Sequence, residues 1–219
     1  MLFALLVGAA PVCAQDAPFG FESFADSTIL TNQYAGTAFS NAIVLSAGIT
    51  LNQLEFPPHA GSNVAGDNGG PITITFVSPP RSFSGYFTYN VTLTMQALDA
   101  SNNVLTSVTS QFSHNQAISG AAGSQPNELV TVSSAAGISK IVIAGSAQGS
   151  SFTVDDASAI TLCDLYQDGY TNVTDVQSIL NQALGAAAPN NDLNGDGVVN
   201  VVDVQIVINA ALGMACIAQ

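Results

Sequence analysis

The sequence is poor in basic residues. Its 219 residues include 15 acidic side chains but only two Lys or Arg side chains, Arg81 and Lys140, so the formal net charge is −13. Binding to nucleic acids or to anionic membranes needs a cluster of cations, and this composition argues against both. An acidic surface instead suits metal cations, neutral ligands such as sugars, or a basic protein partner.

The sequence also lacks any apolar run of the about 20 residues that cross a bilayer. A shorter run, residues 2–10, precedes small residues at Val12 and Ala14. Residues 1–14 are therefore predicted to be a signal peptide, although its basic start is missing. A lipoprotein cysteine at Cys13 and a buried N-terminal strand are the alternatives. We expect a mature protein that is secreted, extracellular or at the cell surface, without an integral membrane segment.

Cysteine is scarce, and only Cys163 and Cys216 remain after cleavage of the signal. They bracket one C-terminal segment of an exported protein, which favours a disulfide over a metal or redox site. The closed loop of about 50 residues would contribute on the order of 4 kcal/mol in the chain-entropy model. Two separate free thiols are the alternative.

Catalytic motifs are absent as well. Gly-x-Ser-x-Gly does not occur, and His59 and His114 belong to no nucleophile motif. A glycosidase needs two carboxylates across a cleft, and nothing in the sequence pairs the available acids in this way. These acids are Glu22, Glu55, Glu128, Asp155 and Asp156. We therefore expect that the chain is not an enzyme, with a glycoside hydrolase as the remaining alternative.

Residues 17–160 alternate apolar and polar side chains in short runs, separated by turns rich in Gly, Pro, Asn and Asp. Strands are predicted at 72–77, 82–89, 91–98, 104–112, 129–132, 138–143 and 152–155. No helical pattern interrupts them. This arrangement predicts a mainly β domain, an antiparallel β-sandwich of the jelly-roll kind.

Residues 161–219 change to a helical period. Apolar residues follow this period at Val176–Leu184 and Val204–Leu212, and each run ends at a glycine, Gly185 or Gly213. We therefore place a domain boundary near residue 161 and expect a small C-terminal α domain.

This second domain contains an internal repeat. Residues 164–185 align without gaps onto residues 192–213, with identity at 13 of 22 positions. The shared acids, amides and glycine occupy positions 1, 5, 6, 9 and 12 of a 12-residue loop, the spacing of an EF-hand calcium loop. Without a cation the three carboxylates of each loop repel one another, so we predict that folding and calcium binding are coupled. Two metal-free Asx-turn helix caps are the alternative.

The two loops differ at position 3. The second loop has Asn194 there, whereas the first has Tyr166, whose phenol is a poor calcium ligand. We predict that the first site is weaker, or that it uses water at this position.

Two loop–helix units with Asp at position 12 and no entering helix resemble a type I dockerin, over Cys163 to Cys216. The resemblance implies two calcium ions and a cohesin module on another protein as partner. It implies a first ligand set of Asp164, Asp168, Tyr170 (carbonyl), Asn172 and Asp175. The second set is Asp192, Asn194, Asp196, Val198 (carbonyl), Asn200 and Asp203. Neither helix carries Lys or Arg, so a cohesin contact would be mostly apolar.

Segments of the first domain, such as Phe21-Glu22 and residues 151–156, resemble exported bacterial β-sandwich proteins. Jelly rolls of this type are similar to carbohydrate-binding modules, which implies a third, structural calcium ion at Glu22, Asp155 and Asp156. Solvated acids and a turn are the alternative.

Aromatic residues that could stack on sugar rings are few, because Trp is absent. The candidates are Tyr34, Tyr86, Tyr89, Phe83 and Phe87. Strand alternation places Phe83, Phe87 and Tyr89 on one face, where we expect the core.

Together these patterns predict an exported non-catalytic protein. Its dockerin-like tail binds two calcium ions and docks to a cohesin-type or surface partner, presenting the β-sandwich in polysaccharide utilisation or cell-surface assembly. A carbohydrate-binding β-sandwich is the alternative function.

Overall fold

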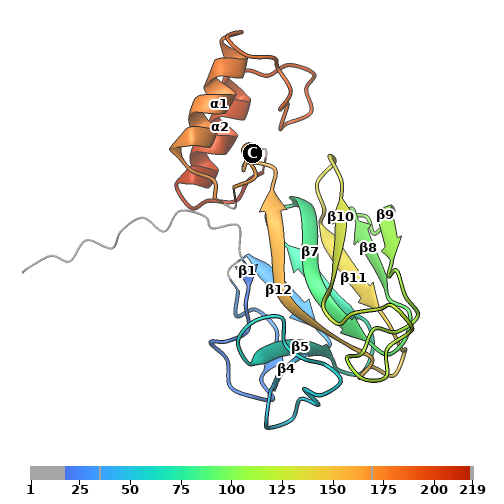
Figure 1. The fold of residues 1–219 in the computed structure, drawn as a ribbon. Helices are drawn as coiled ribbons and strands as arrows, with labels where there is room; N and C mark the ends of the chain where they lie inside the picture. The colour runs from blue at the N-terminus through green and yellow to red at the C-terminus, as the bar shows by residue number, and fades with distance from the viewer. Residues whose placement is uncertain (1–17, 35, 169, 218–219) are drawn as a thin grey trace, which may run out of the picture. The chain divides into compact units, whose positions relative to one another are not determined.

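The computed structural model describes residues 18–217 except residues 35 and 169, so the predicted signal peptide lies outside the described residues. The chain divides into two compact units (Figure 1). The first unit ends at Leu162, and the second, here called the C-terminal unit, begins at Cys163.

The first unit is built from β-strands. They are β1 (Pro18–Phe19), β2 (Ile29–Leu30), β3 (Thr37–Ser40), β4 (Ala42–Ser46), β5 (Asn63–Asp67), β6 (Ile72–Phe76), β7 (Pro80–Tyr89), β8 (Thr94–Leu98), β9 (Val104–Thr109), β10 (Glu128–Ser133), β11 (Lys140–Ala144) and β12 (Phe152–Thr161). One sheet has the order β10-β7-β12-β5-β4-β2, with β1 paired to β12, and the other has the order β3-β6-β11-β8-β9. All these pairings are antiparallel, so the predicted mainly β fold with antiparallel sheets is confirmed.

The inner faces of the two sheets share one apolar core. Phe83 and Phe87 of β7 are fully buried, and Phe83 meets Phe76 of the opposite sheet at a ring distance of 6.2 Å. A Cβ at Gly85 between them would approach Val154 Cγ2 to 2.8 Å, so this inward position accepts glycine alone. The alternation that predicted an inward face for Phe83 and Phe87 is confirmed, and it turns Tyr86 outward.

The C-terminal unit contains two helices of 11 residues, α1 (Val173–Ala183) and α2 (Val201–Ala211). Each starts three residues before the apolar period suggests, because Asn172 and Asn200 act as N-caps in capping boxes. Gly185 and Gly213 follow the helix ends with φ values of 72° and 86°, as helix-terminating glycines do. No helix in the described part of the chain is long and apolar enough to cross a membrane.

A disulfide links the two ends of the C-terminal unit. Cys163 and Cys216 are bonded, with their Cα atoms 5.9 Å apart and both side chains buried. Between the helices, Ile179 and Val207 are fully buried. The bond closes a segment with a sequence separation of 53 residues around this small core.

Candidate functional sites

The second predicted calcium loop brings its polar side chains together. The Asp192 carboxylate accepts hydrogen bonds from the backbone N–H groups of residues 195–197, at 2.7–3.2 Å. The Asp196 carboxylate accepts hydrogen bonds from the side-chain amides of Asn194 and Asn200, at 2.9 and 3.1 Å. The hydrogen bond from Asn194 is the largest of the interactions that lower the pKa of Asp196. Oxygen-bearing side chains from positions 1, 3, 5 and 9 thus gather in one loop.

The acids at position 12 occupy equivalent places in the two loops. Asp203 is fully buried and accepts hydrogen bonds from the backbone N–H groups of Leu193, Asn194 and Asn200, at 2.7, 3.3 and 2.8 Å. Asp175 is also fully buried, and it accepts from the N–H groups of Leu165, Tyr166 and Asn172, at 2.8, 3.2 and 2.9 Å. Each acid therefore ties the start of its loop to the start of the following helix.

Among the described residues of the first loop, the acids at positions 1 and 5 accept hydrogen bonds from the backbone. Asp164 accepts a hydrogen bond from the N–H of Asp168 at 3.2 Å, and Asp168 accepts one from the N–H of Tyr170 at 3.0 Å. Tyr166, at position 3, is 63% exposed, whereas the equivalent Asn194 contacts the acid at position 5. Position 6 of this loop, Gly169, lies outside the described residues. The difference at position 3 thus extends from the sequence to the side-chain contacts.

The charged side chains of the C-terminal unit are all negative. Residues 163–219 contain six Asp and no Lys, Arg or His, and the carboxylates of Asp164, Asp175 and Asp203 are fully buried. Burying a carboxylate is costly unless hydrogen bonds or a cation compensate it. Backbone N–H groups supply this compensation at Asp175 and Asp203, and the segment contains no basic side chain that could pair with the six carboxylates.

The donors of each loop fit calcium by their chemistry. They are carboxylates, amide side chains and a backbone carbonyl, which are the hard oxygen ligands that Ca²⁺ prefers. Among the described residues, no three acidic, His or Cys side chains form a group that could hold a metal ion. The carboxylates are turned to the amides of their own loops, so binding a cation would require some of them to exchange partners.

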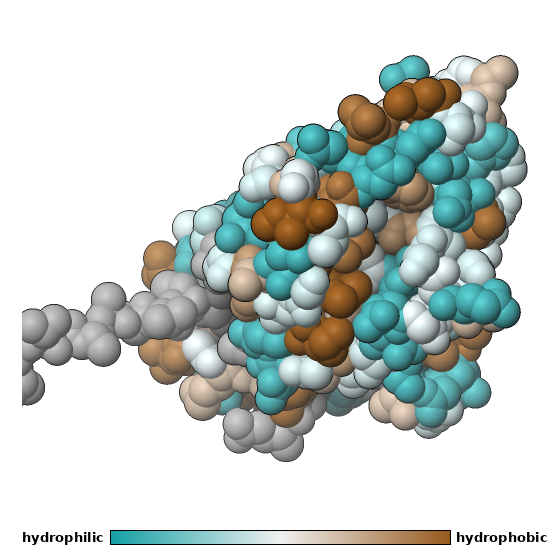
Figure 2. All heavy atoms as spheres, turned by 90° about the horizontal axis from the view of Figure 1, so that it is seen from below, coloured by the Kyte–Doolittle hydropathy of each residue, from teal (hydrophilic) through white to brown (hydrophobic). Residues whose placement is uncertain are grey.

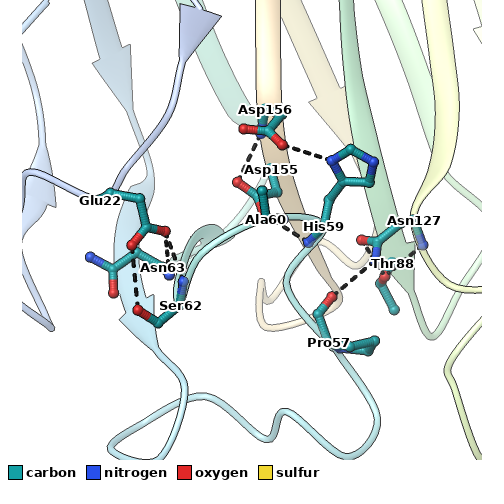
Figure 3. A network of polar contacts seen from close by, with 10 residues as sticks. All are labelled: Glu22, Pro57, His59, Ala60, Ser62, Asn63, Thr88, Asn127, Asp155 and Asp156. Carbon is teal, nitrogen blue, oxygen red and sulfur yellow. Dashed lines mark hydrogen bonds and ion pairs between the residues drawn. The ribbon is translucent and has the colours of Figure 1, made fainter.

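On the first unit, two of the three acids predicted to hold a third ion, Glu22 and Asp155, fasten one loop (Figure 3). Glu22 accepts hydrogen bonds from the N–H groups of Ser62 and Asn63, at 3.0 and 2.7 Å. Asp155 accepts from the N–H groups of His59 and Ala60, at 2.8 and 3.0 Å, and its burial raises its pKa. Together these contacts bind residues 59–63 to the rest of the unit. The third calcium ion stays a prediction.

The third of these acids, Asp156, contacts a pair of stacked aromatic rings on the outer face of the sheet. The rings of His59 and Tyr86 lie 3.5 Å apart and within 8° of parallel. His59 Nδ1 is 2.7 Å from an Asp156 carboxylate oxygen, and the two side chains are 36% and 37% exposed. The sequence offers no motif for this group, because His59 and Asp156 are 97 positions apart.

The other aromatic candidates face inward. Tyr89 is buried with its hydroxyl bonded to Glu128, and burial raises its pKa to about 12. Tyr34 is half-buried, donates its hydroxyl hydrogen bond to the carbonyl of Gly20, and has its pKa raised to about 12 by desolvation. Of the five aromatic residues proposed from the sequence, Tyr86 alone stands on the outer face of its sheet.

The remaining polar candidates contact their neighbours rather than each other. Glu55 accepts hydrogen bonds from the N–H groups of Ile118 and Ser119, the second of which is the main cause of its lowered pKa. His114 lies 2.9 Å from the hydroxyl of Ser113. None of these contacts joins Glu55, Glu128 or His114 to another of the three.

No known protein family matches the chain, and no curated protein matches it. Similar solved structures include TmCBM61 in complex with β-1,4-galactotriose, at 13% identity over 67% of this chain and 98% of that chain, with a TM-score of 0.37. CsCBM6-3 from Clostridium stercorarium in complex with cellobiose has 17% identity, 64% and 95% coverage, and a TM-score of 0.35. The K1 cleaved adhesin domain of Lys-gingipain from Porphyromonas gingivalis has 11% identity, 58% and 92% coverage, and a TM-score of 0.38. Similarity at this level does not identify a ligand.

Proposed function

We propose that this chain is an exported, non-catalytic binding protein with two roles. The β-sandwich binds carbohydrate, and the C-terminal unit binds two calcium ions and attaches the protein to a partner. The observation that supports carbohydrate binding is the exposed stack of His59 on Tyr86, with a carboxylate beside it. The observation that supports calcium binding is the set of three buried carboxylates in a segment without basic residues.

Carbohydrate binding is tested with the full chain on insoluble polysaccharides. We expect retention on at least one glycan and weaker retention of Tyr86→Ala, since the tyrosine ring forms the base of the stack. No retention across a diverse panel would contradict carbohydrate binding and favour a surface module without a glycan ligand. Release of reducing sugar would instead support a hydrolase.

Calcium binding is expected to occur at two unequal sites. Loop two offers Asn194 at position 3, whereas Tyr166 in loop one is exposed and offers no amide oxygen, so the second loop should bind more tightly. Isothermal titration of the metal-free full chain measures both affinities. Tyr166→Asn should bring the two affinities together, and two equal sites in the wild-type chain would contradict the prediction.

The two loops can be distinguished with terbium, which replaces calcium and emits when a nearby tyrosine is excited. Tyr166 and Tyr170 lie in loop one, and loop two has no aromatic residue. Sensitised emission should therefore follow the filling of loop one and should lag behind the calorimetric signal of the tighter site.

The attachment partner is proposed to be a cohesin-type or other surface protein. Val173 and Val201, at position 10 of the two loops, are 75% and 76% exposed. Figure 2 shows, on one face of the molecule, exposed hydrophobic residues in small groups between polar ones. With no basic residue in either helix, the contact with a partner would be mostly apolar.

A further inference from the structure

The outer face of β7 presents a mixed row of side chains at Tyr86. In the antiparallel register Tyr86 pairs with Leu129 of β10 on one side and with Asp155 of β12 on the other. Leu129 is exposed. Asp155 is buried beneath the backbone of residues 59 and 60 and accepts hydrogen bonds from their N–H groups. Tyr86 is therefore flanked by an apolar residue and by the loop that carries His59.

The stacking geometry determines which part of His59 faces the solvent. Tyr86 covers one face of the imidazole at 3.5 Å, and the His59 side chain is 36% exposed, so we take the solvent-facing part of the ring to be the face turned away from Tyr86. Asp156 holds Nδ1 at 2.7 Å and so fixes the plane of the ring. The result is a flat, oriented ring surface with a half-exposed carboxylate at its edge (Figure 3).

A backbone irregularity aims Asp156 at this ring. The pairing of β12 with β7 shifts register between Asp155 and Ser158, and Asp156 has a φ of 42°, which is unusual for a residue other than glycine. Glu22 and Asp155 already fasten residues 59–63 through four backbone N–H groups. The surface pair of His59 and Asp156 is thus additional to what holds the loop, and strained positions of this kind concentrate at functional sites.

We propose that the outer face of His59, with the Asp156 carboxylate at its edge, is the platform for one pyranose ring of an uncharged glycan. This inference rests on the proposed carbohydrate binding and names its site and ligand class. The C–H face of the sugar packs on the imidazole, and hydroxyl groups of the sugar donate hydrogen bonds to Asp156. Anionic sugars are disfavoured, because the Asp156 carboxylate borders the His59 ring and the chain has a net charge of −13.

The inference is tested with the full chain by affinity electrophoresis and pull-down on xylan, β-1,4-galactan and cellulose as uncharged probes, and on polygalacturonate as an anionic one. We expect retention on at least one uncharged glycan and none on polygalacturonate. On the glycan that binds, His59→Ala should weaken binding about tenfold, whereas His59→Phe, which keeps a flat ring, should stay within about threefold of the wild type. The affinity of Asp156→Asn for the same glycan should fall between those of His59→Ala and His59→Phe.

His114→Ala is the matched control, because it removes the other histidine of the chain, whose ring contacts Ser113, and it should bind as the wild type does. Near-UV circular dichroism and melting temperature establish that each variant is folded. Undiminished binding by both His59→Ala and Asp156→Asn would overturn the platform while leaving carbohydrate binding intact, and equal loss by His59→Phe and His59→Ala would also overturn it. Retention of no glycan by the wild type would overturn the proposed carbohydrate binding itself.

Discussion

Removal of calcium together with reduction of the Cys163–Cys216 disulfide is expected to unfold the C-terminal unit and to leave the β-sandwich folded. The disulfide closes a loop with a sequence separation of 53 residues, which corresponds to on the order of 4 kcal/mol in the chain-entropy model. Helices of 11 residues are marginal in isolation, and six Asp carboxylates repel one another without a counter-charge. The C-terminal unit should therefore need calcium or the disulfide to stay folded, and should unfold when both are removed.

The measurement is far-UV circular dichroism at 222 nm on the full chain, with scanning calorimetry to follow the sandwich separately. Chelator alone and reductant alone in calcium are the two controls, and each should leave more helical signal than the combination. The Cys163→Ser/Cys216→Ser double variant in chelator should behave as the reduced wild type does. A helical signal that survives chelator plus reductant unchanged would show that neither support is required.

Asp203→Ala should produce the largest loss of stability of any single substitution in the C-terminal unit. The buried carboxylate accepts hydrogen bonds from three backbone N–H groups, and alanine leaves these donors without their acceptor while also removing a proposed calcium ligand. We expect a loss on the order of 3 kcal/mol in the free energy of unfolding of this unit in calcium. Urea denaturation followed at 222 nm measures it.

The matched control for this substitution is Asp175→Ala, which removes the equivalent acid of the weaker loop. In metal-free buffer, where each acid stabilises the unit through its hydrogen bonds alone, Asp175→Ala should lower the free energy of unfolding by about as much as Asp203→Ala. In calcium it should lower it by less than Asp203→Ala. If Asp203→Ala has the same effect with and without calcium, the carboxylate serves only as a helix cap and not as a ligand.

The strands from β6 onward follow in place from the sequence because each is a run of five or more residues, most with clear alternation, but β12 continues six residues beyond its predicted end at residue 155. The earlier strands were not predicted. β1 and β2 have two residues each, Ser27 with a positive φ precedes β2, and Asn41 with a positive φ separates β3 from β4. β5 is buried along its whole length, so it has no alternation to detect. The helix starts were predicted three residues late because Val173 and Val201 are exposed and add nothing to the apolar period.

The two candidate sites differ in how far the sequence predicts them. The loops of the C-terminal unit are local, so the spacing of Asp192, Asn194 and Asp196 suffices to bring these residues together in space. The group of His59, Tyr86 and Asp156 depends on strand pairing and on a register shift in β12, which no pattern within one segment indicates. The folded structure was required to find it.

The central claim, that the twin loops of the C-terminal unit hold calcium, is tested most directly by hydrogen exchange of the full chain with the disulfide intact. We predict that calcium slows amide exchange at residues 164–175 and 192–203 by tenfold or more, and that it leaves exchange within β7 and β12 unchanged. Identical exchange of both loops in calcium and in metal-free buffer would contradict the account.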